Sequence, residues 1–340
     1  MRLMSHFLLR GMRRHTDIFV IFGPLLNPAW HFMKKWKQKA IVQKAISYLP
    51  YPQRINFLFQ KYVTRGVQLT DHYFFDRLQH ARNHISAWRK SSGDRVPQST
   101  LELGTGWYPI VPVTMFLLGA GKIYSVDISQ LTSRKRLLLT LQRFTQAEEN
   151  NTLAEYVSWR PERMAVIHEM LRNPDPLSLE QMLARLHIHY LLEDARSISL
   201  RDGSIDLVHS NNTFEHIYPD ILRSILAEFK RIVRKPGGVM SHFVDMTDHF
   251  AHFDPSINVY HFLRFSERQW RWIDNGIQPQ NRLRADDYLG LYADLDIPVT
   301  NEDCRPGDVE ALRTIPLAAQ FREKPLSVIA RTHCHYRSAF

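Results

Sequence analysis

The stretch that most constrains the fold is LELGTGWYP at residues 101–109, followed by IYSVDIS at residues 123–129. A short apolar strand carries Glu102, a Gly-x-Gly turn follows, and a helix is expected after Pro109, because proline suits the first turn of a helix. A second strand ends on Asp127, 21 residues after Gly106. This is about the interval at which an acid meets ribose hydroxyls in a Rossmann-like sheet. The order predicts a parallel sheet that binds a nucleotide-type ligand at the carboxyl ends of its strands.

Downstream of residue 99, strands alternate with helices, which is typical of α/β proteins. We expect strands at residues 101–103, 123–126, 187–192, 205–209 and 239–244, and helices at 110–118, 219–233 and 286–293. A final hairpin at the sheet edge is expected from residues 297–300 and 327–332. The predicted fold class is therefore a Rossmann-like, seven-stranded, mostly parallel sheet with helices on both faces.

The net charge of +10 is unevenly distributed along the chain. Residues 1–100 hold 17 Lys and Arg against 4 Asp, which leaves 27 basic and 30 acidic residues for the remainder. The segment SSGD at 91–94 is typical of a linker. We therefore predict a basic, mostly helical extension over residues 1–95. A sheet domain would follow over 96–340, with insertions at about 130–186 and 246–284.

The extension has two interpretations. Its apolar run at residues 18–22 is short and is followed by Gly23 and Pro24. It is far below the length of a membrane-spanning helix, and it lacks a signal-peptide cleavage site. One interpretation is a helical cap packed on the sheet domain. The other is a basic, aromatic-rich segment that lies on an anionic membrane surface.

The only two cysteines, Cys304 and Cys334, do not have the spacing of a metal-binding or redox pair. Neither a disulfide scaffold nor a structural zinc site is therefore expected. This cysteine usage favours a reducing, cytoplasmic location.

Four segments resemble the class I S-adenosylmethionine (SAM)-dependent methyltransferases: ELGTG (102–106), VDIS (126–129), EDARSISLRDGSIDLVHSNNTFEHI (193–217) and LAEFKRIVRKPGG (226–238). The resemblance covers roughly residues 97–245 and implies SAM as cofactor. It places the methionine end of SAM at Glu102 and at the backbone of Gly104, Thr105 and Gly106. The remaining implied contacts are Asp127 with Ile128 at the ribose, Asp194 with the amide of Ala195 at the adenine, and Asn211 beside the sulfonium.

The chain departs from the family pattern at Tyr108, where many members carry a third glycine. Trp107 and Tyr108 could wall the cofactor or a ring-shaped substrate, or they could pack under the N-terminal extension. The helix can still begin at this point because Pro109 suits its first turn.

Methyl transfer to a hydroxyl benefits from a general base, and histidine is the usual one. His216, which follows the fourth predicted strand, is the first candidate for contact with the acceptor, and packing on the next helix is its alternative. Asp245 and His249 follow the fifth strand, with His252 and Asp254 nearby. This second group could act as a His–Asp base pair, hold a divalent cation, or form a hydrogen-bonded loop without metal. We expect no metal.

A third candidate region joins Arg282 and Arg284 with Trp270 and Trp272 just upstream. Tryptophan rings stack on sugars and arginines bind carboxylate or phosphate. The alternatives are core tryptophans and solvated arginines.

The region after the fifth strand is similar to methyltransferases of bacterial surface-polysaccharide and small-molecule tailoring. The favoured function is therefore O-methylation of a hydroxyl on a sugar or other small molecule, a lipid-linked glycan included. An RNA methyltransferase that uses the basic extension is one alternative, although no RNA-binding module is recognisable. A catalytically silent methyltransferase-like scaffold is the other, and the acids Glu102, Asp127 and Asp194 argue against it.

Overall fold

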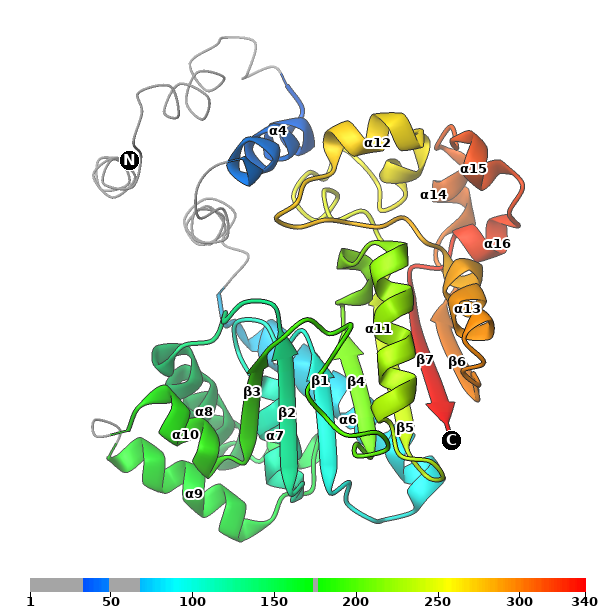
Figure 1. Ribbon diagram of the computed structural model, residues 1–340. Coiled ribbons are helices and arrows are strands. Elements are labelled where there is room, and N and C mark those ends of the chain that lie inside the picture. The colour runs from blue at the N-terminus through cyan, green and yellow to red at the C-terminus, as the bar shows by residue number, and fades with distance from the viewer. Residues whose placement is uncertain (1–32, 49–67, 174–176) are drawn as a thin grey trace, which may run out of the picture. The chain divides into compact units, whose positions relative to one another are not determined.

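The computed structural model describes residues 33–48, 68–173 and 177–340 (Figure 1). Their contacts divide the chain into two compact units. The sheet unit contains residues 68–246, 283–305 and 333–340. The helical unit contains residues 33–48, 247–282 and 306–332 of the described chain. Each unit is therefore built from segments that are far apart in the sequence.

The sheet unit is organised around a seven-stranded sheet with the order β3-β2-β1-β4-β5-β7-β6. The first five strands run parallel to their neighbours. They are β1 (Ser99–Leu103), β2 (Lys122–Asp127), β3 (Ile188–Leu192), β4 (Leu207–Asn211) and β5 (Val239–Asp245). The carboxyl ends of β1, β2, β4 and β5 therefore lie along one edge of the sheet, which is where such sheets bind ligands. The predicted α/β fold is confirmed.

Helices cover both faces of this sheet. α6 (Asp71–Ser92) and α7 (Ile110–Leu118) pack against each other on one face, and α8 (Arg134–Glu149), α9 (Pro161–Arg172) and α10 (Leu179–Arg185) extend the same core. α11 (Pro219–Ile232) covers the opposite face, where its Phe229 ring stacks on His242 of β5. α13 (Ala285–Asp294) places Tyr288 and Tyr292 against Tyr336 of β7.

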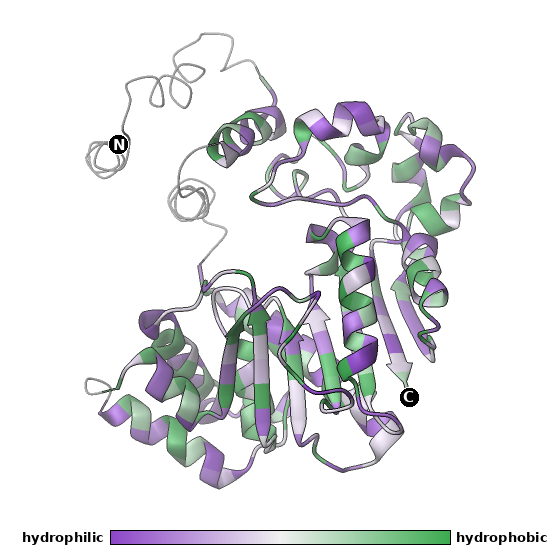
Figure 2. Cartoon of the chain, in the orientation of Figure 1, coloured by the Kyte–Doolittle hydropathy of each residue, from purple (hydrophilic) through white to green (hydrophobic). Residues whose placement is uncertain are grey.

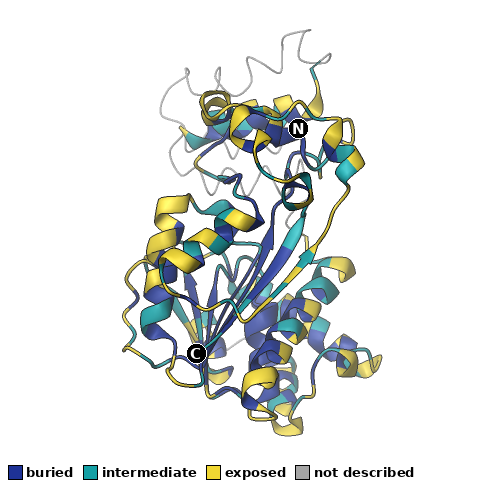
Figure 3. Cartoon of the chain, turned by 90° about the vertical axis from the view of Figure 1, so that its right-hand side faces the viewer, coloured by how far each residue is buried: buried dark blue, intermediate teal, exposed yellow. Residues whose placement is uncertain are grey.

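Hydropathy explains this layering. Strands β1 to β5 combine apolar residues with a few polar ones, the edge strand β6 is mostly polar, and the helices carry both polar and apolar residues (Figure 2). In α11, Leu222, Ile225, Phe229 and Ile232 recur at helical spacing and are all buried. Figure 3 shows the consequence, with buried strands and exposed residues concentrated on the outer helices.

The edge of the sheet differs from the sequence-based expectation. β6 (Asn301–Arg305) and β7 (His333–Ala339) are antiparallel partners, and β7 is also antiparallel to β5. Residues 297–300 and 327–332 were expected as these strands, so the predicted positions are wrong. The true strands are partly polar, with alternating exposure in β6, and apolar periodicity alone does not mark such an edge strand.

The two cysteines lie opposite each other in these strands. Cys304 pairs with Cys334 in the antiparallel register, and the two residues form a disulfide. Their spacing along the chain gave no indication of it, because the register of two distant strands brings them together.

The helical unit has a small core of its own. Its elements are α4 (Lys35–Ser47), η5 (His261–Arg264), α12 (Glu267–Ile273), α14 (Val309–Arg313), α15 (Ala319–Arg322) and α16 (Leu326–Ile329). Trp36 of α4 lies against the rings of Phe250, His261 and Phe265, and its backbone N–H donates to Asp254 at 3.0 Å. α4 is thus held by residues from the predicted insertion at 246–284.

The composition-based domain boundary at residue 95 does not coincide with the division by contacts. α6 lies before that boundary, but it belongs to the sheet unit. Its buried residues Phe74, Leu78, Ala81, Ile85 and Trp88 supply part of the sheet unit's core. The apolar run at 18–22 and the basic segment before residue 33 lie outside the described residues. Within the described ranges, no helix has the length and apolar character needed to span a bilayer.

Candidate active site

The turn between β1 and α7 is shaped by two glycines. Gly104 has φ +76°, and a Cβ at this position would lie 2.6 Å from Oγ1 of Thr213. Gly106 has φ +71°, and no heavy atom of the chain lies within 4 Å of the place where its Cβ would be. Gly104 therefore leaves room for the Thr213 side chain to approach the turn, whereas Gly106 leaves open space at the carboxyl edge of the sheet.

Glu102 of β1 lies directly before this turn and is only 4% exposed. The Thr105 hydroxyl donates to its Oε2 at 2.8 Å, and Nδ2 of Asn211 donates to its Oε1 at 3.3 Å. Burial and, to a smaller extent, the nearby Asp127 raise the pKa of Glu102, whereas the hydrogen bonds from Thr105 and Asn211 lower it, and the resulting pKa is about 7. The result is a buried acid that can carry its charge near neutral pH.

Asp127 ends β2, the strand next to β1. The hydroxyl of Tyr190 in β3 donates to its Oδ2 at 2.8 Å, and the backbone N–H groups of Gly106 and Thr105 also bind its carboxyl group. Burial raises the pKa of Asp127 to about 6 against these hydrogen bonds. The glycine turn and Asp127 are thus directly linked.

The sequence analysis missed Tyr190. Its position in β3 carries no motif, and its contact with Asp127 depends on the parallel pairing of β2 with β3. Only the strand order could have revealed it.

The remaining predicted cofactor residues lie after β2 and β3. Ile128 follows Asp127 and is 85% exposed, unusual for an isoleucine. Asp194 follows β3, and its carboxylate forms an ion pair with the guanidinium of Arg196, which lowers its pKa to about 2. Ala195 is buried beside it.

Asn211, at the end of β4, is held from two sides. It donates to Glu102, and its Oδ1 lies 2.8 Å from Nε2 of His84 on α6. Tyr73, also on α6, packs its ring edge-to-face against Tyr108, so Tyr108 packs on a helix that was assigned to the extension. The sequence analysis missed this contribution of α6, because nothing in the helix pattern shows which face of which strand it covers.

The two predicted catalytic residues of the sheet unit follow neighbouring strands. His216 ends a short 3₁₀ helix (Phe214–His216) after β4, and Asp245 is the last residue of β5. Glu215, directly before His216, is 1% exposed, and burial together with the Asp245 charge raises its pKa well above the usual value. His333 of β7 places Nε2 3.6 Å from Oδ1 of Asp245. This end of the sheet therefore concentrates carboxyl and imidazole groups.

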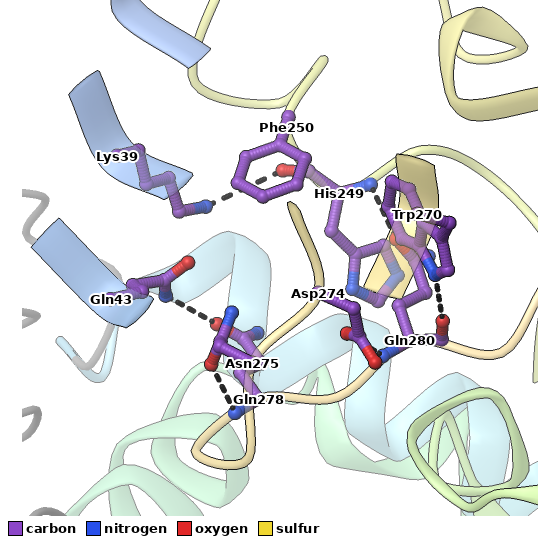
Figure 4. Close-up of a pocket in the computed structure, with 9 residues that line it drawn as sticks. All are labelled: Lys39, Gln43, His249, Phe250, Trp270, Asp274, Asn275, Gln278 and Gln280. Carbon is purple, nitrogen blue, oxygen red and sulfur yellow. Dashed lines mark hydrogen bonds between the residues drawn. The ribbon is translucent and has the colours of Figure 1, made fainter. Parts of the chain in front are cut away.

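The third predicted catalytic residue, His249, belongs to the helical unit. It lines a small cavity of about 20 Å³ with Lys39, Phe250, Trp270 and Gln280 (Figure 4). Lys39 Nζ lies 3.5 Å from the His249 carbonyl oxygen, and the His249 N–H donates to Oε1 of Gln280 at 3.3 Å. A cavity of this volume has room for about one water molecule.

The other candidates of this region have structural partners. Asp254 accepts hydrogen bonds from the backbone N–H groups of Trp36 and Ser256, and His252 lies 3.2 Å from the Thr247 hydroxyl. Arg282 is buried, donates to the Phe262 carbonyl and forms an ion pair with Glu267.

Of the two tryptophans and the second arginine of this region, two side chains are buried and one is exposed. Trp270 is buried and donates to the Gln280 carbonyl, whereas Trp272 is 77% exposed. Arg284 is fully buried and donates to the Met246 carbonyl at 2.7 Å. Three of the four residues proposed for ring or anion binding are therefore part of packed structure.

Comparison with known proteins gives a family match within the sheet unit. Residues 156–241, which contain β3, β4 and α11, match the family profile described as "Methyltransferase domain". No curated protein matches the chain.

Solved structures similar to this chain include three methyltransferases. A SAM-dependent methyltransferase from Mesorhizobium loti shares 13% identity, with 77% of this chain and 99% of that chain covered and a TM-score of 0.41. Geranyl diphosphate C-methyltransferase from Streptomyces coelicolor A3(2) shares 10% identity, with 76% and 79% covered and a TM-score of 0.41. Phosphoethanolamine N-methyltransferase 2 from Haemonchus contortus shares 10% identity, with 76% and 52% covered and a TM-score of 0.41.

The profile match and the seven-stranded, mostly parallel sheet lead to the same assignment. Residues 156–241 therefore identify a methyltransferase domain within the sheet unit, with SAM as its cofactor.

Proposed function

We propose that the chain transfers the methyl group of SAM to a hydroxyl oxygen of a sugar or another small molecule. The observation that carries the proposal is the linked set of Glu102, Asn211 and Asp127 around the glycine turn. The buried Glu102 and the partly buried Asp127, beside an open space at Gly106, fit a ligand with an ammonium group and a ribose.

The residues of this set have distinct roles. Glu102 accepts the α-ammonium group of SAM, and the backbone at Gly104, Thr105 and Gly106 lies along the methionine end. Asp127 accepts hydrogen bonds from the ribose hydroxyls, with Tyr190 holding its carboxyl group in place. The strong preference of carboxylates for hydroxyl and ammonium donors supports both assignments.

The adenine end is assigned to Ile128, Asp194 and Ala195. The exposed apolar side chain of Ile128 offers contact area to one face of the base. Asp194 accepts from the exocyclic amine while it shares its carboxylate with Arg196, and the amide of Ala195 donates to the ring.

Catalysis needs an aligned acceptor and a proton acceptor. SAM, when bound, supplies an electrophilic methyl group. His216 takes the proton of the acceptor hydroxyl as the oxygen attacks, and Asp245, whose Oδ1 lies 3.6 Å from Nε2 of His333, is a further acceptor contact at the same end of the sheet. Asn211 lies beside the sulfonium, and His249, four residues after Asp245 in the chain, is proposed as a further acceptor contact.

The basic extension over residues 1–95 is proposed to contact an anionic membrane or an anionic substrate. The positive charge of this extension supports the proposal. A lipid-linked glycan is one class of acceptor that such a contact would favour. A cytoplasmic location stays a prediction from the sequence, and the Cys304–Cys334 disulfide argues against a reducing compartment.

Mass spectrometry on cell extracts tests the acceptor. Extracts from cells without the protein are incubated with trideuteromethyl-SAM and either purified wild type or the His216→Gln variant. We expect wild type to label a hydroxyl-bearing glycan or small molecule as a methyl ether, and the variant to label it at least about tenfold more slowly. Label found only on nitrogen, on carbon or on RNA would contradict the proposal.

A further inference from the structure

A continuous chain of hydrogen bonds crosses the α6-facing side of the sheet and ends on Glu102. It begins at Arg337 of β7, whose Nε donates to Nδ1 of His335 at 3.4 Å. His335 Nε2 lies 2.7 Å from the Ser241 hydroxyl of β5, which lies 2.8 Å from Nδ1 of His84. His84 Nε2 then meets Oδ1 of Asn211, which donates to Glu102. All six residues belong to the sheet unit.

The two ends of this chain fix its direction. A guanidinium only donates hydrogen bonds, and an ionised carboxylate only accepts them. Reading from Arg337, His335 accepts at Nδ1 and donates from Nε2, Ser241 accepts and donates to His84, and His84 donates from Nε2 to the Asn211 carbonyl. The amide nitrogen of Asn211 then faces Glu102. Every donor in this direction meets an acceptor.

The reverse direction places like groups against each other at both ends. His335 would present an N–H to the N–H of Arg337, and Asn211 would turn its carbonyl oxygen toward the Glu102 carboxylate. Unmatched buried polar groups of this kind are strongly unfavourable. The reverse arrangement is therefore excluded while Glu102 is ionised.

Both imidazoles must stay neutral for this pattern, since each uses one nitrogen as an acceptor. His84 has 0% and His335 3% of its surface exposed. Burial lowers the pKa of His84 to about 4 and that of His335 to about 2. The hydrogen-bond chain is accordingly intact at neutral pH.

We propose that His84 is a positioning residue for SAM binding. Its Nε2–H fixes the Asn211 amide so that the amide nitrogen donates to Glu102, which holds this carboxylate in place for the amino group of the cofactor. The inference rests on the proposed assignment of Glu102 and Asn211 to SAM.

Two conservative substitutions separate this role from simple packing. In His84→Gln, the terminal amide keeps an N–H near the position of Nε2 and can still donate to Asn211. In His84→Asn, the shorter amide reaches only the level of Nδ1, so it can contact Ser241 but not Asn211. We expect His84→Gln to bind S-adenosylhomocysteine within about threefold of wild type, and His84→Asn at least about tenfold more weakly.

His80, one turn earlier on α6, provides the matched control. It is 5% exposed and packs its ring 4.3 Å from that of Phe243, but Asp76 is its partner instead of Asn211. His80→Gln and His80→Asn should both bind S-adenosylhomocysteine as wild type does. Equal affinities for the two His84 variants, or equal losses in the His80 pair, would overturn the inference.

Calorimetric titration of the purified full chain, with melting temperatures recorded in parallel, gives these affinities. If wild type binds no S-adenosylhomocysteine, the proposed function itself fails, which is distinct from equal binding by the His84 variants.

A second test applies if His84→Asn does not fold. Arg337→Met removes the donor that sets the direction and should weaken binding about threefold. Asp303→Asn removes only the partner of Arg337 at 3.4 Å and should not. Unchanged binding by Arg337→Met would also contradict the inference.

Discussion

Glu102 and Asp127 are acids of neighbouring strands that the fold keeps largely from water, each with fixed donors around its carboxyl group. Asp194 follows the next strand but is half exposed and paired with Arg196. The same residue type thus meets two environments along one sheet edge. The pKa of each buried acid is raised by burial, whereas the pKa of Asp194 is lowered by its cationic neighbour.

These raised pKa values predict a pH dependence of ligand binding. Because Glu102 has a pKa of about 7 and must be ionised to pair with an ammonium group, affinity for S-adenosylhomocysteine should rise about eightfold between pH 6 and pH 7.5. Glu102→Gln should bind more weakly with a flatter profile, the remainder arising from Asp127. Titrations at several pH values measure this, and a Glu102→Gln profile as steep as that of wild type would contradict it.

The stability of the ligand-free protein should change in the opposite direction. The folded protein holds protons on Glu102 and Asp127 at pH values where the unfolded chain has lost them, so their contribution to stability falls as pH rises from about 4 to about 7. Glu102→Gln should therefore be more stable than wild type at pH 8, by on the order of 2 kcal/mol. Chemical denaturation of both proteins at pH 5 and pH 8 tests this. A variant less stable than wild type at pH 8 would show that the ionised carboxylate is not penalised.

At the scale of elements, the α6-facing side of the sheet carries an unusually polar row. Glu102, His209, Ser241 and Arg337 are in register across β1, β4, β5 and β7. The period of two along each strand is readable from sequence, because alternate residues share a face. The strand order is not, and it is the insertion of β7 antiparallel to β5 that brings His335 to Ser241. The cofactor motif could be predicted from its residues, but the hydrogen bonds that support it could not.

The strand pair β6–β7 gives a prediction at the same scale. The Cys304–Cys334 disulfide closes a loop with a sequence separation of 30. Loop-closure entropy for about 30 residues corresponds to about 3.6 kcal/mol. Reducing agent should therefore lower the melting temperature of wild type, while a Cys304→Ser, Cys334→Ser double variant should melt at the reduced value under both conditions. An identical melting temperature for reduced and oxidised wild type would mean that the pairing of β6 with β7 does not depend on the disulfide.

At the scale of the whole molecule, two compact units are assembled from interleaved segments. Charge and linker composition placed a boundary near residue 95, but α6 contributes core residues to the sheet unit and residues 306–332 belong to the helical unit. Sequence periodicity identifies amphipathic helices without showing which surface they cover. The sheet class, the helices flanking it and SAM as cofactor follow from local patterns. The partners of Asp127, Asn211 and the two cysteines depend on contacts between distant segments.

Calorimetric titration of wild type and Asp127→Ala with S-adenosylhomocysteine tests the central claim most directly. We expect one ligand to bind per wild-type chain and the variant to bind at least about tenfold more weakly, with Tyr190→Phe intermediate between them. No binding to wild type at millimolar ligand, or an affinity unchanged by Asp127→Ala in a folded protein, would contradict the account.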